Sequence, residues 1–159
     1  MKSIHGGDIY NNKVNMDFSV NINPLGIPYS VKEAMSDALS YADRYPDMEC
    51  SGLKKAISEY FTQQSCSIQS EDVIPGNGAS ELFMAIAHAI KPKKAVLLAP
   101  GFLGYEHVLR AVGCDIGYFL LDEQSDFSPA ARLDELMDML TEDTDIFFIP
   151  NQNNPTGYL

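Results

Sequence analysis

Residues 76–99, GNGASELFMAIAHAIKPKKAVLLA, decide the fold. Two glycines lead into residues 79–90, which are apolar on nearly every side and therefore predict a helix buried in a core. Residues 95–99 form an apolar run without polar alternation, as expected of a strand that helices cover on both faces. A buried helix joined to a buried strand indicates the α/β class.

The same alternation continues toward the C-terminus. Apolar residues at helical spacing predict helices at 105–112 and 133–140, and apolar runs predict strands at 115–121 and 146–149. Strands that alternate with helices need crossover connections and pair in parallel. We therefore expect a mostly parallel sheet flanked by helices.

The residues before this sheet follow other patterns. Residues 1–29 are rich in Asn, Gly and Pro and predict an irregular arm with one strand-like piece at 16–20. A capping box formed by Ser30 and Glu33 predicts the start of a helix, whose apolar spacing continues as far as Ala42. A second amphipathic helix is expected over residues 53–61.

These patterns predict three parts: an arm at 1–29, a helical segment at 30–71, and a sheet domain at 72–159. The chain ends in the loop that follows the third predicted strand, before a helix could cover that strand. We therefore expect the sheet domain to be truncated. Its uncovered apolar surface would promote aggregation or unusual oligomers.

The composition narrows the choice of partners and compartment. The 159 residues carry a formal net charge of −11, which disfavours binding to nucleic acid and to anionic membranes. Three cysteines without CxxC spacing favour reduced thiols, and no metal site is expected. The N-terminus lacks the apolar stretch of a signal peptide, so we place the protein in the cytoplasm.

Gly76-Asn77-Gly78-Ala79-Ser80-Glu81 could hold an anion. Backbone N–H groups at a helix start, together with the helix dipole, attract a phosphate, and glycines allow close approach. A plain tight turn before a helix is the simpler interpretation of this segment taken alone.

Two further loops follow predicted strands. Pro100-Gly101-Phe102-Leu103-Gly104-Tyr105 brings aromatic rings to the carboxyl edge of the sheet, where a ring can stack on a flat heterocycle. Asn153-Asn154-Pro155-Thr156-Gly157 brings amides to the same edge, where ligands of open parallel sheets bind. Core aromatics and a surface turn are the alternatives, and for Tyr105 the core is favoured.

In their order and spacing these three segments resemble the class I/II aminotransferases, which are fold-type I enzymes that use pyridoxal 5′-phosphate (PLP). The upstream segments His5-Gly6-Gly7, Asp17-Phe18-Ser19-Val20-Asn21-Ile22-Asn23-Pro24-Leu25-Gly26 and Arg44-Tyr45-Pro46-Asp47 resemble the branch that contains histidinol-phosphate aminotransferase and threonine-phosphate decarboxylase. The resemblance covers essentially the whole chain and implies a PLP-transferase-like large domain.

The resemblance also implies a set of contacts with PLP. The backbone around Gly78, Ala79 and Ser80 would bind the phosphate. Phe102 would stack on the pyridine ring, and Asn154 would donate a hydrogen bond to the phenolic oxygen. The protein would hold the cofactor, which itself carries the electron-sink chemistry.

Other residues would act at the substrate and across a subunit interface. Tyr45 would reach the phosphate in the neighbouring subunit's site, so the resemblance implies a homodimer. Asn23 would lie near the substrate carboxylate, and His5 and Gly6 would belong to a segment that folds over the substrate. An exposed terminal residue is the alternative for His5.

The family's Schiff-base lysine lies after the Asn-Pro-Thr-Gly turn, and only Tyr158 and Leu159 follow that turn here. The chain alone is therefore expected to be inactive, with no catalytic residue of its own. The leading prediction for the parent enzyme is amino transfer between an amino acid, including a phosphorylated one such as histidinol phosphate, and a 2-oxo acid. Decarboxylation of threonine phosphate in cobalamin biosynthesis, a non-catalytic PLP-binding remnant and a nucleotide-binding domain are the alternatives.

Overall fold

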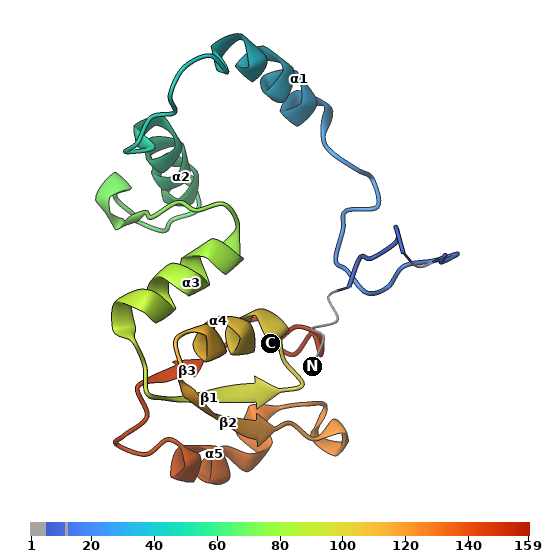
Figure 1. The fold of residues 1–159 in the computed structure, drawn as a ribbon, viewed down its shortest axis with the longest axis vertical. Coiled ribbons are helices and arrows are strands. Elements are labelled where there is room, and N and C mark those ends of the chain that lie inside the picture. Colours follow the sequence, from blue (N-terminus) through green and yellow to red (C-terminus); the bar gives the residue numbers. More distant parts are fainter. Residues whose placement is uncertain (1–5, 12) are drawn as a thin grey trace. The chain divides into compact units, whose positions relative to one another are not determined.

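A computed structural model describes residues 6–11 and 13–159 of the chain (Figure 1). The chain divides into two compact units, Met1–Glu49 and Cys50–Leu159. The division into three parts that the sequence predicts stays a prediction. The two units are described separately.

The first unit is an arm followed by one helix. Helix α1 spans Tyr29–Ala38 and continues into a 3-10 turn, Leu39–Tyr41. The predicted capping box is wrong, because Pro28 is the N-cap residue and no side chain caps the helix. The helix begins at Tyr29, so Ser30 lies inside its first turn and is not the N-cap residue.

The strand-like piece predicted at 16–20 is also wrong, since these residues form bends and irregular backbone. A strand needs a neighbouring strand to satisfy its backbone groups. Instead, the Asp17 carboxylate accepts a hydrogen bond from the Ser19 backbone N–H at 2.8 Å, and the Ser19 hydroxyl accepts one from Gly7 N–H at 2.8 Å. These contacts give the arm a local turn structure.

The second unit contains the sheet. Helix α2 spans Ser51–Gln63, and a short 3-10 turn lies at Ser70–Asp72. The elements that follow are α3 (Ala79–Ile90), β1 (Lys94–Ala99), α4 (Leu103–Ala111), β2 (Asp115–Leu120), α5 (Leu133–Met139) and β3 (Ile146–Phe148), with 3-10 turns at Glu123–Ser125 and Pro129–Arg132. Each predicted helix and strand from residue 79 onward is therefore present.

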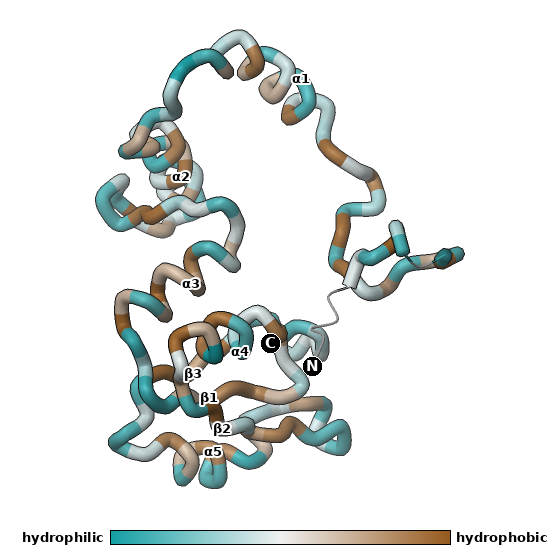
Figure 2. The backbone as a smooth tube through the Cα atoms, in the orientation of Figure 1, coloured by the Kyte–Doolittle hydropathy of each residue, from teal (hydrophilic) through white to brown (hydrophobic). Residues whose placement is uncertain are grey.

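The three strands form a parallel sheet in the order β2-β1-β3. Ala95 of β1 pairs with Ile116 of β2 on one side and with Ile146 of β3 on the other. Strand β1 is therefore the central strand, and it is hydrophobic along most of its length in Figure 2. The predicted α/β class and parallel sheet are confirmed.

Both faces of β1 are covered, because successive side chains of a strand point to opposite faces. Ala95 and Leu97 belong to a core with residues of α3 and α4, including the fully buried Leu109. Val96 and Leu98 belong to a second core with Leu136 of α5 and Phe119 of β2. Figure 1 shows α4 and α5 on opposite sides of the sheet.

Helix α3 is less buried than its sequence predicts. Only Ala87 of its residues is fully buried, and Ile86 and Ile90 are 42% and 52% exposed. One face packs against α4 through Phe83 and Met84, whereas side chains on the rest of the helix surface stay exposed within this unit. The sequence therefore predicted more burial of this helix than the structure shows. Among the described residues, no helix has the length and apolar content that crossing a bilayer requires.

Candidate functional site

The strand order creates a crevice at one edge of the sheet. From β1 the chain passes through α4 to β2 on one side, and β3 lies on the other side of β1. Open parallel sheets bind ligands at the carboxyl ends of the strands, where the strand order reverses. Here those ends are the loop after Ala99 and the loop after Phe148.

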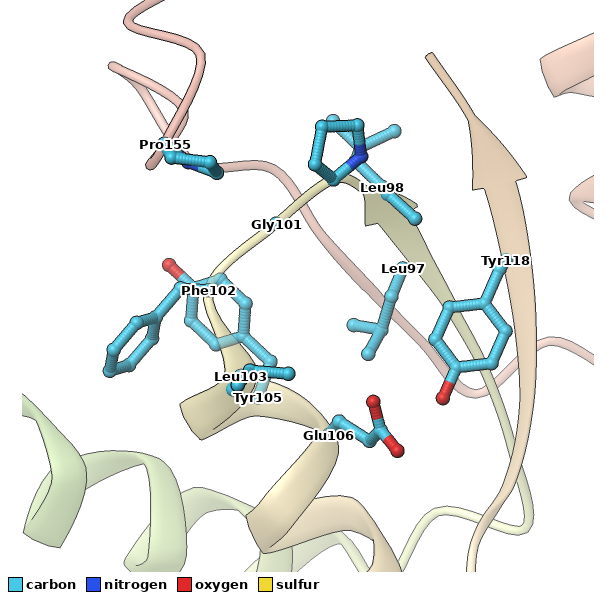
Figure 3. Close-up of a pocket in the computed structure, with 11 residues that line it drawn as sticks. Leu97, Leu98, Gly101, Phe102, Leu103, Tyr105, Glu106, Tyr118 and Pro155 are labelled. Atoms are coloured by element: carbon cyan, nitrogen blue, oxygen red, sulfur yellow. The ribbon is translucent and has the colours of Figure 1, made fainter. Parts of the chain in front are cut away.

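A pocket of about 290 Å³ lies at this edge (Figure 3). Its lining comes from the end of β1, the following loop with Phe102, the first turns of α4, Tyr118 of β2 and Pro155 from the loop after β3. The predicted ring-stacking residue Phe102 and the Asn-Pro-Thr-Gly turn are therefore brought to one site from segments about fifty residues apart.

The ring of Phe102 is held by a glycine and by an aromatic cluster. A Cβ at Gly104 would overlap the Phe102 ring, so only glycine leaves room for the ring in this position. The ring meets Tyr105 edge-on, with centroids 5.4 Å apart, and Tyr105 stacks on Phe148 of β3 at 4.6 Å. Tyr105 belongs to the partly buried residues around the core, as predicted.

The loop after β3 is organised around Asn153, which is only 3% exposed. Its side-chain Nδ2 donates hydrogen bonds to the carbonyl oxygen of Pro100 at 3.0 Å and to Thr156 Oγ1 at 2.9 Å. The next residue, Asn154, is exposed, so its amide is available to a ligand. The sequence did not single out Asn153, since two adjacent asparagines give no sign of which one is buried.

Glu106 and Tyr118 add polar groups to one wall of the pocket (Figure 3). Arg110 Nε donates to Glu106 Oε1 at 2.7 Å, and an Arg110 amino group donates to the Tyr118 hydroxyl at 3.3 Å. The hydrogen bond from Arg110 is the main reason that the pKa of Glu106 lies below its usual range, and Tyr118 contributes to the same lowering. Burial raises the pKa of Tyr118. No sequence motif indicated this cluster, although Glu106 and Arg110 stand at i, i+4 spacing.

The N-terminus of α3 has the backbone expected of an anion site. Gly78 is its N-cap residue with φ +81° and ψ 166°, a conformation that favours glycine. Ala79 and Ser80 form the first turn, whose N–H groups have no partner within the helix. The carboxylate of Glu81 accepts a hydrogen bond from the Asn77 backbone N–H. Gly78, Ala79 and Ser80 are not among the described residues that line the pocket with Phe102.

The predicted site residues of the arm lie in the first unit. Asn23 holds its own turn, because its amide donates to the Gly26 carbonyl oxygen at 3.1 Å and its Oδ1 accepts from Leu25 N–H at 3.0 Å. A Cβ at Gly6 would overlap the carbonyl oxygen of Ser19, so the arm is tightly folded there. Tyr45 is fully exposed. His5 lies outside the described residues.

The comparisons with known proteins point to one family. The family model named Aminotransferase class I and II matches residues 13–159. A threonine-phosphate decarboxylase of Salmonella typhimurium is 36% identical over 144 residues, which cover 91% of this chain and 37% of that protein. A histidinol-phosphate aminotransferase of Mannheimia succiniciproducens is 32% identical over 143 residues, with 86% of this chain and 35% of that protein covered.

Solved structures agree on the fold. The histidinol-phosphate aminotransferase of Clostridium acetobutylicum superposes with a TM-score of 0.71 at 29% identity, covering 89% of this chain and 39% of that chain. An alanine aminotransferase of Pyrococcus furiosus gives a TM-score of 0.72 at 23% identity, over 83% of this chain and 34% of that chain. The chain thus spans well under half the length of these relatives.

The family match covers the sheet, the loops at its carboxyl edge and most of the arm. The resemblance drawn from the sequence motifs is confirmed. The chain belongs to the class I and II aminotransferases, a family of PLP-dependent enzymes.

Proposed function

We propose that this chain forms part of a PLP-dependent enzyme that transfers an amino group between an amino acid and a 2-oxo acid. The observation that carries the proposal is the meeting of the Phe102 loop and the Asn154 turn at the carboxyl edge of a parallel sheet. A phosphorylated amino compound such as histidinol phosphate is the proposed donor class. The activity named for the Mannheimia succiniciproducens relative supports this choice.

The residues present fit the chemical groups of PLP. The half-buried Phe102 offers an aromatic face, and the exposed Asn154 amide can donate to the phenolic oxygen. The N-cap of the twelve-residue helix α3 is Gly78, which has positive φ, so the N–H groups of the first turn can hold a dianionic phosphate. A phosphate there would compete with the Glu81 carboxylate for the Asn77 N–H.

Bound PLP supplies the electron sink for the reaction, and the residues of this chain hold and orient the cofactor. In our proposal Phe102 excludes water from one ring face, Asn154 fixes the phenolic oxygen, and Gly78, Ala79 and Ser80 bind the phosphate.

Two further proposals concern the first unit. The fully exposed Tyr45 reaches the phosphate of a second subunit in a homodimer. Asn23, His5 and Gly6 contribute to the substrate side of the site. We also place the reaction in the cytoplasm, with small molecules as its substrates.

Decarboxylation of threonine phosphate is the second candidate function. It is favoured by the Salmonella typhimurium relative, which is 36% identical and matches 91% of this chain. The two candidates place the same demands on Phe102 and Asn154, and they differ in which bond of the substrate breaks.

Assays of the full-length protein distinguish the two activities. Purified protein would be saturated with PLP and given histidinol phosphate with 2-oxoglutarate, or threonine phosphate alone. Formation of glutamate supports amino transfer, whereas release of carbon dioxide supports decarboxylation. Neither product, together with tight PLP binding, would favour a binding remnant and would overturn both catalytic proposals.

Two variants test the site itself. Phe102→Leu and Asn154→Ala should each weaken PLP binding about tenfold or more, because each removes a direct contact with the ring. Leu159→Ala, an exposed residue at the end of the same segment, serves as the control. Unchanged PLP affinity in both site variants would show that the cofactor binds elsewhere.

A further inference from the structure

Asn153 is the only buried residue of the loop after β3, whose other residues are exposed or half-buried. It is 3% exposed, whereas its neighbours Gln152 and Asn154 are both exposed. Burying an amide costs free energy unless hydrogen bonds compensate, and here the side-chain hydrogen bonds are all made by Nδ2. They extend in two directions, into its own loop and across to the loop after β1.

Within its own loop Asn153 closes a turn. Its backbone N–H donates to the Tyr158 carbonyl oxygen at 2.9 Å, and its carbonyl oxygen accepts from Gly157 N–H at 2.7 Å. Its Nδ2 adds the bond to Thr156 Oγ1 at 2.9 Å. The turn that presents Asn154 is therefore built on Asn153.

Across the crevice the same Nδ2 donates to the Pro100 carbonyl oxygen at 3.0 Å. Pro100 stands two residues before Phe102, and Phe102 is the N-cap residue of α4. One amide group thus joins the segment that carries Phe102 to the segment that carries Asn154. Both of its side-chain bonds use Nδ2, while its Oδ1 has no partner among the described residues.

We propose that Asn153 is a positioning residue that fixes the spacing between the ring-stacking residue Phe102 and the amide of Asn154. This inference rests on the proposed function of those two residues. The donor character of Nδ2 is the essential property, because a carbonyl oxygen at Pro100 can only accept a hydrogen bond.

The test compares Asn153→Asp with Asn151→Asp in the full-length protein. Both substitutions add one negative charge to the same loop and keep the side-chain size, but Asn151 is exposed and Asn153 is buried. The aspartate at 153 would present oxygen to the Pro100 carbonyl and lose both donated bonds. We expect the PLP dissociation constant to rise about tenfold for Asn153→Asp and less than about twofold for Asn151→Asp.

A double-mutant cycle separates positioning from general destabilisation. If Asn153 acts through Asn154, adding Asn153→Asp to Asn154→Ala should weaken PLP binding by less than about twofold further, because residues that act as one unit are not additive. Fully additive losses would overturn the proposal. So would equal PLP affinity in Asn153→Asp and Asn151→Asp.

Amide hydrogen exchange provides a readout that needs no cofactor. Asn153→Asp should accelerate exchange of the Tyr105 and Gly157 N–H groups, which bond to Phe102 and Asn153, and Asn151→Asp should not. Failure of the wild-type protein to bind PLP would refute the proposed function, and unchanged exchange would separately refute the link between the loops.

A pair of smaller substitutions keeps the proposal testable if Asn153→Asp fails to fold. Thr156→Val removes the hydroxyl that accepts from Nδ2, and Thr156→Ser keeps it. We expect weaker PLP binding in the valine variant and restoration in the serine variant. Equal affinities would contradict the role of this hydrogen bond.

Discussion

The carboxylate of Asp145 accepts a hydrogen bond from the backbone N–H of Lys93 at 2.7 Å, across 52 residues of chain. The same carboxylate accepts a second bond from Lys94 N–H at 3.1 Å. Asp145 directly precedes β3, and Lys94 begins β1. The amino ends of the two strands are thereby joined by one side chain.

This contact predicts a specific dependence of stability on pH. The two backbone N–H groups lower the pKa of Asp145 in the folded state. Its carboxylate therefore contributes stability above the ordinary Asp pKa of about 3.9, and the contribution is lost as the pH falls through the lowered folded value. The substitution Asp145→Asn removes the titrating group and should flatten the loss of stability between neutral and acid pH. Urea unfolding at a series of pH values measures the effect.

Asp138→Asn is the matched control, because Asp138 is an exposed residue of α5. It should keep the pH dependence of the wild-type protein. A wild-type pH profile in Asp145→Asn would show that the two backbone bonds do not govern the titration.

The Glu106 carboxyl should titrate at higher pH when its partner is removed. Arg110 is the largest cause of the lowered pKa and Tyr118 a smaller one. Arg110→Met should therefore raise the pKa of Glu106 more than Tyr118→Phe does. NMR titration of the side-chain carboxyl carbon follows this directly. Arg132→Met removes a cation that pairs with Glu135 instead, so it should leave Glu106 unchanged. The reverse order of the two shifts would contradict the hydrogen-bond assignment.

Gly104→Ala should displace the Phe102 ring, because the added Cβ would overlap it. NMR signals of the Phe102 and Tyr105 rings should shift, since the rings touch edge-on. Gly52→Ala adds a Cβ that meets no atom within 4 Å and should leave these signals in place. That control should also stabilise α2 by about 0.4–1 kcal/mol. Unshifted ring signals in Gly104→Ala would mean that Phe102 does not lie over the glycine.

Truncation of a buried leucine should reduce the unfolding free energy far more than truncation of an exposed one. Leu109 is fully buried, so Leu109→Ala should cost about 2–5 kcal/mol of unfolding free energy. Leu120 is 65% exposed, and Leu120→Ala should cost far less. Chemical denaturation of both variants tests this. Similar losses would place Leu109 outside the core.

The sequence predicted the sheet unit well because each of its elements has a strong local pattern. Residues 79–90 match α3 at both ends, and the runs at 95–99 and 115–121 match β1 and β2 to within a residue. Local pattern also misled in two places. The helix predicted to start with a Ser30 capping box has Pro28 as its N-cap residue, and α3, predicted to be buried, has Ala87 as its only buried residue.

The sequence could predict which segments form the candidate site, but not every residue that matters within them. Motif order placed Phe102 and Asn154 at the same edge of the sheet, and the strand order agrees. Asn153 and the cluster of Glu106 could not be found, because their importance depends on contacts with Pro100 and Tyr118 that only the folded chain brings near.

The place of β3 beside β1 has a consequence for synthesis on the ribosome. Residue 145 and the strand after it emerge 51 residues later than Lys94. At ordinary translation speeds β3 is therefore synthesised about 3–10 s after β1. During that interval one edge of an apolar strand is open to pairing with other nascent chains. Slow translation after residue 99 should therefore lower the yield of native protein, and a chaperone that shields strand edges should restore it.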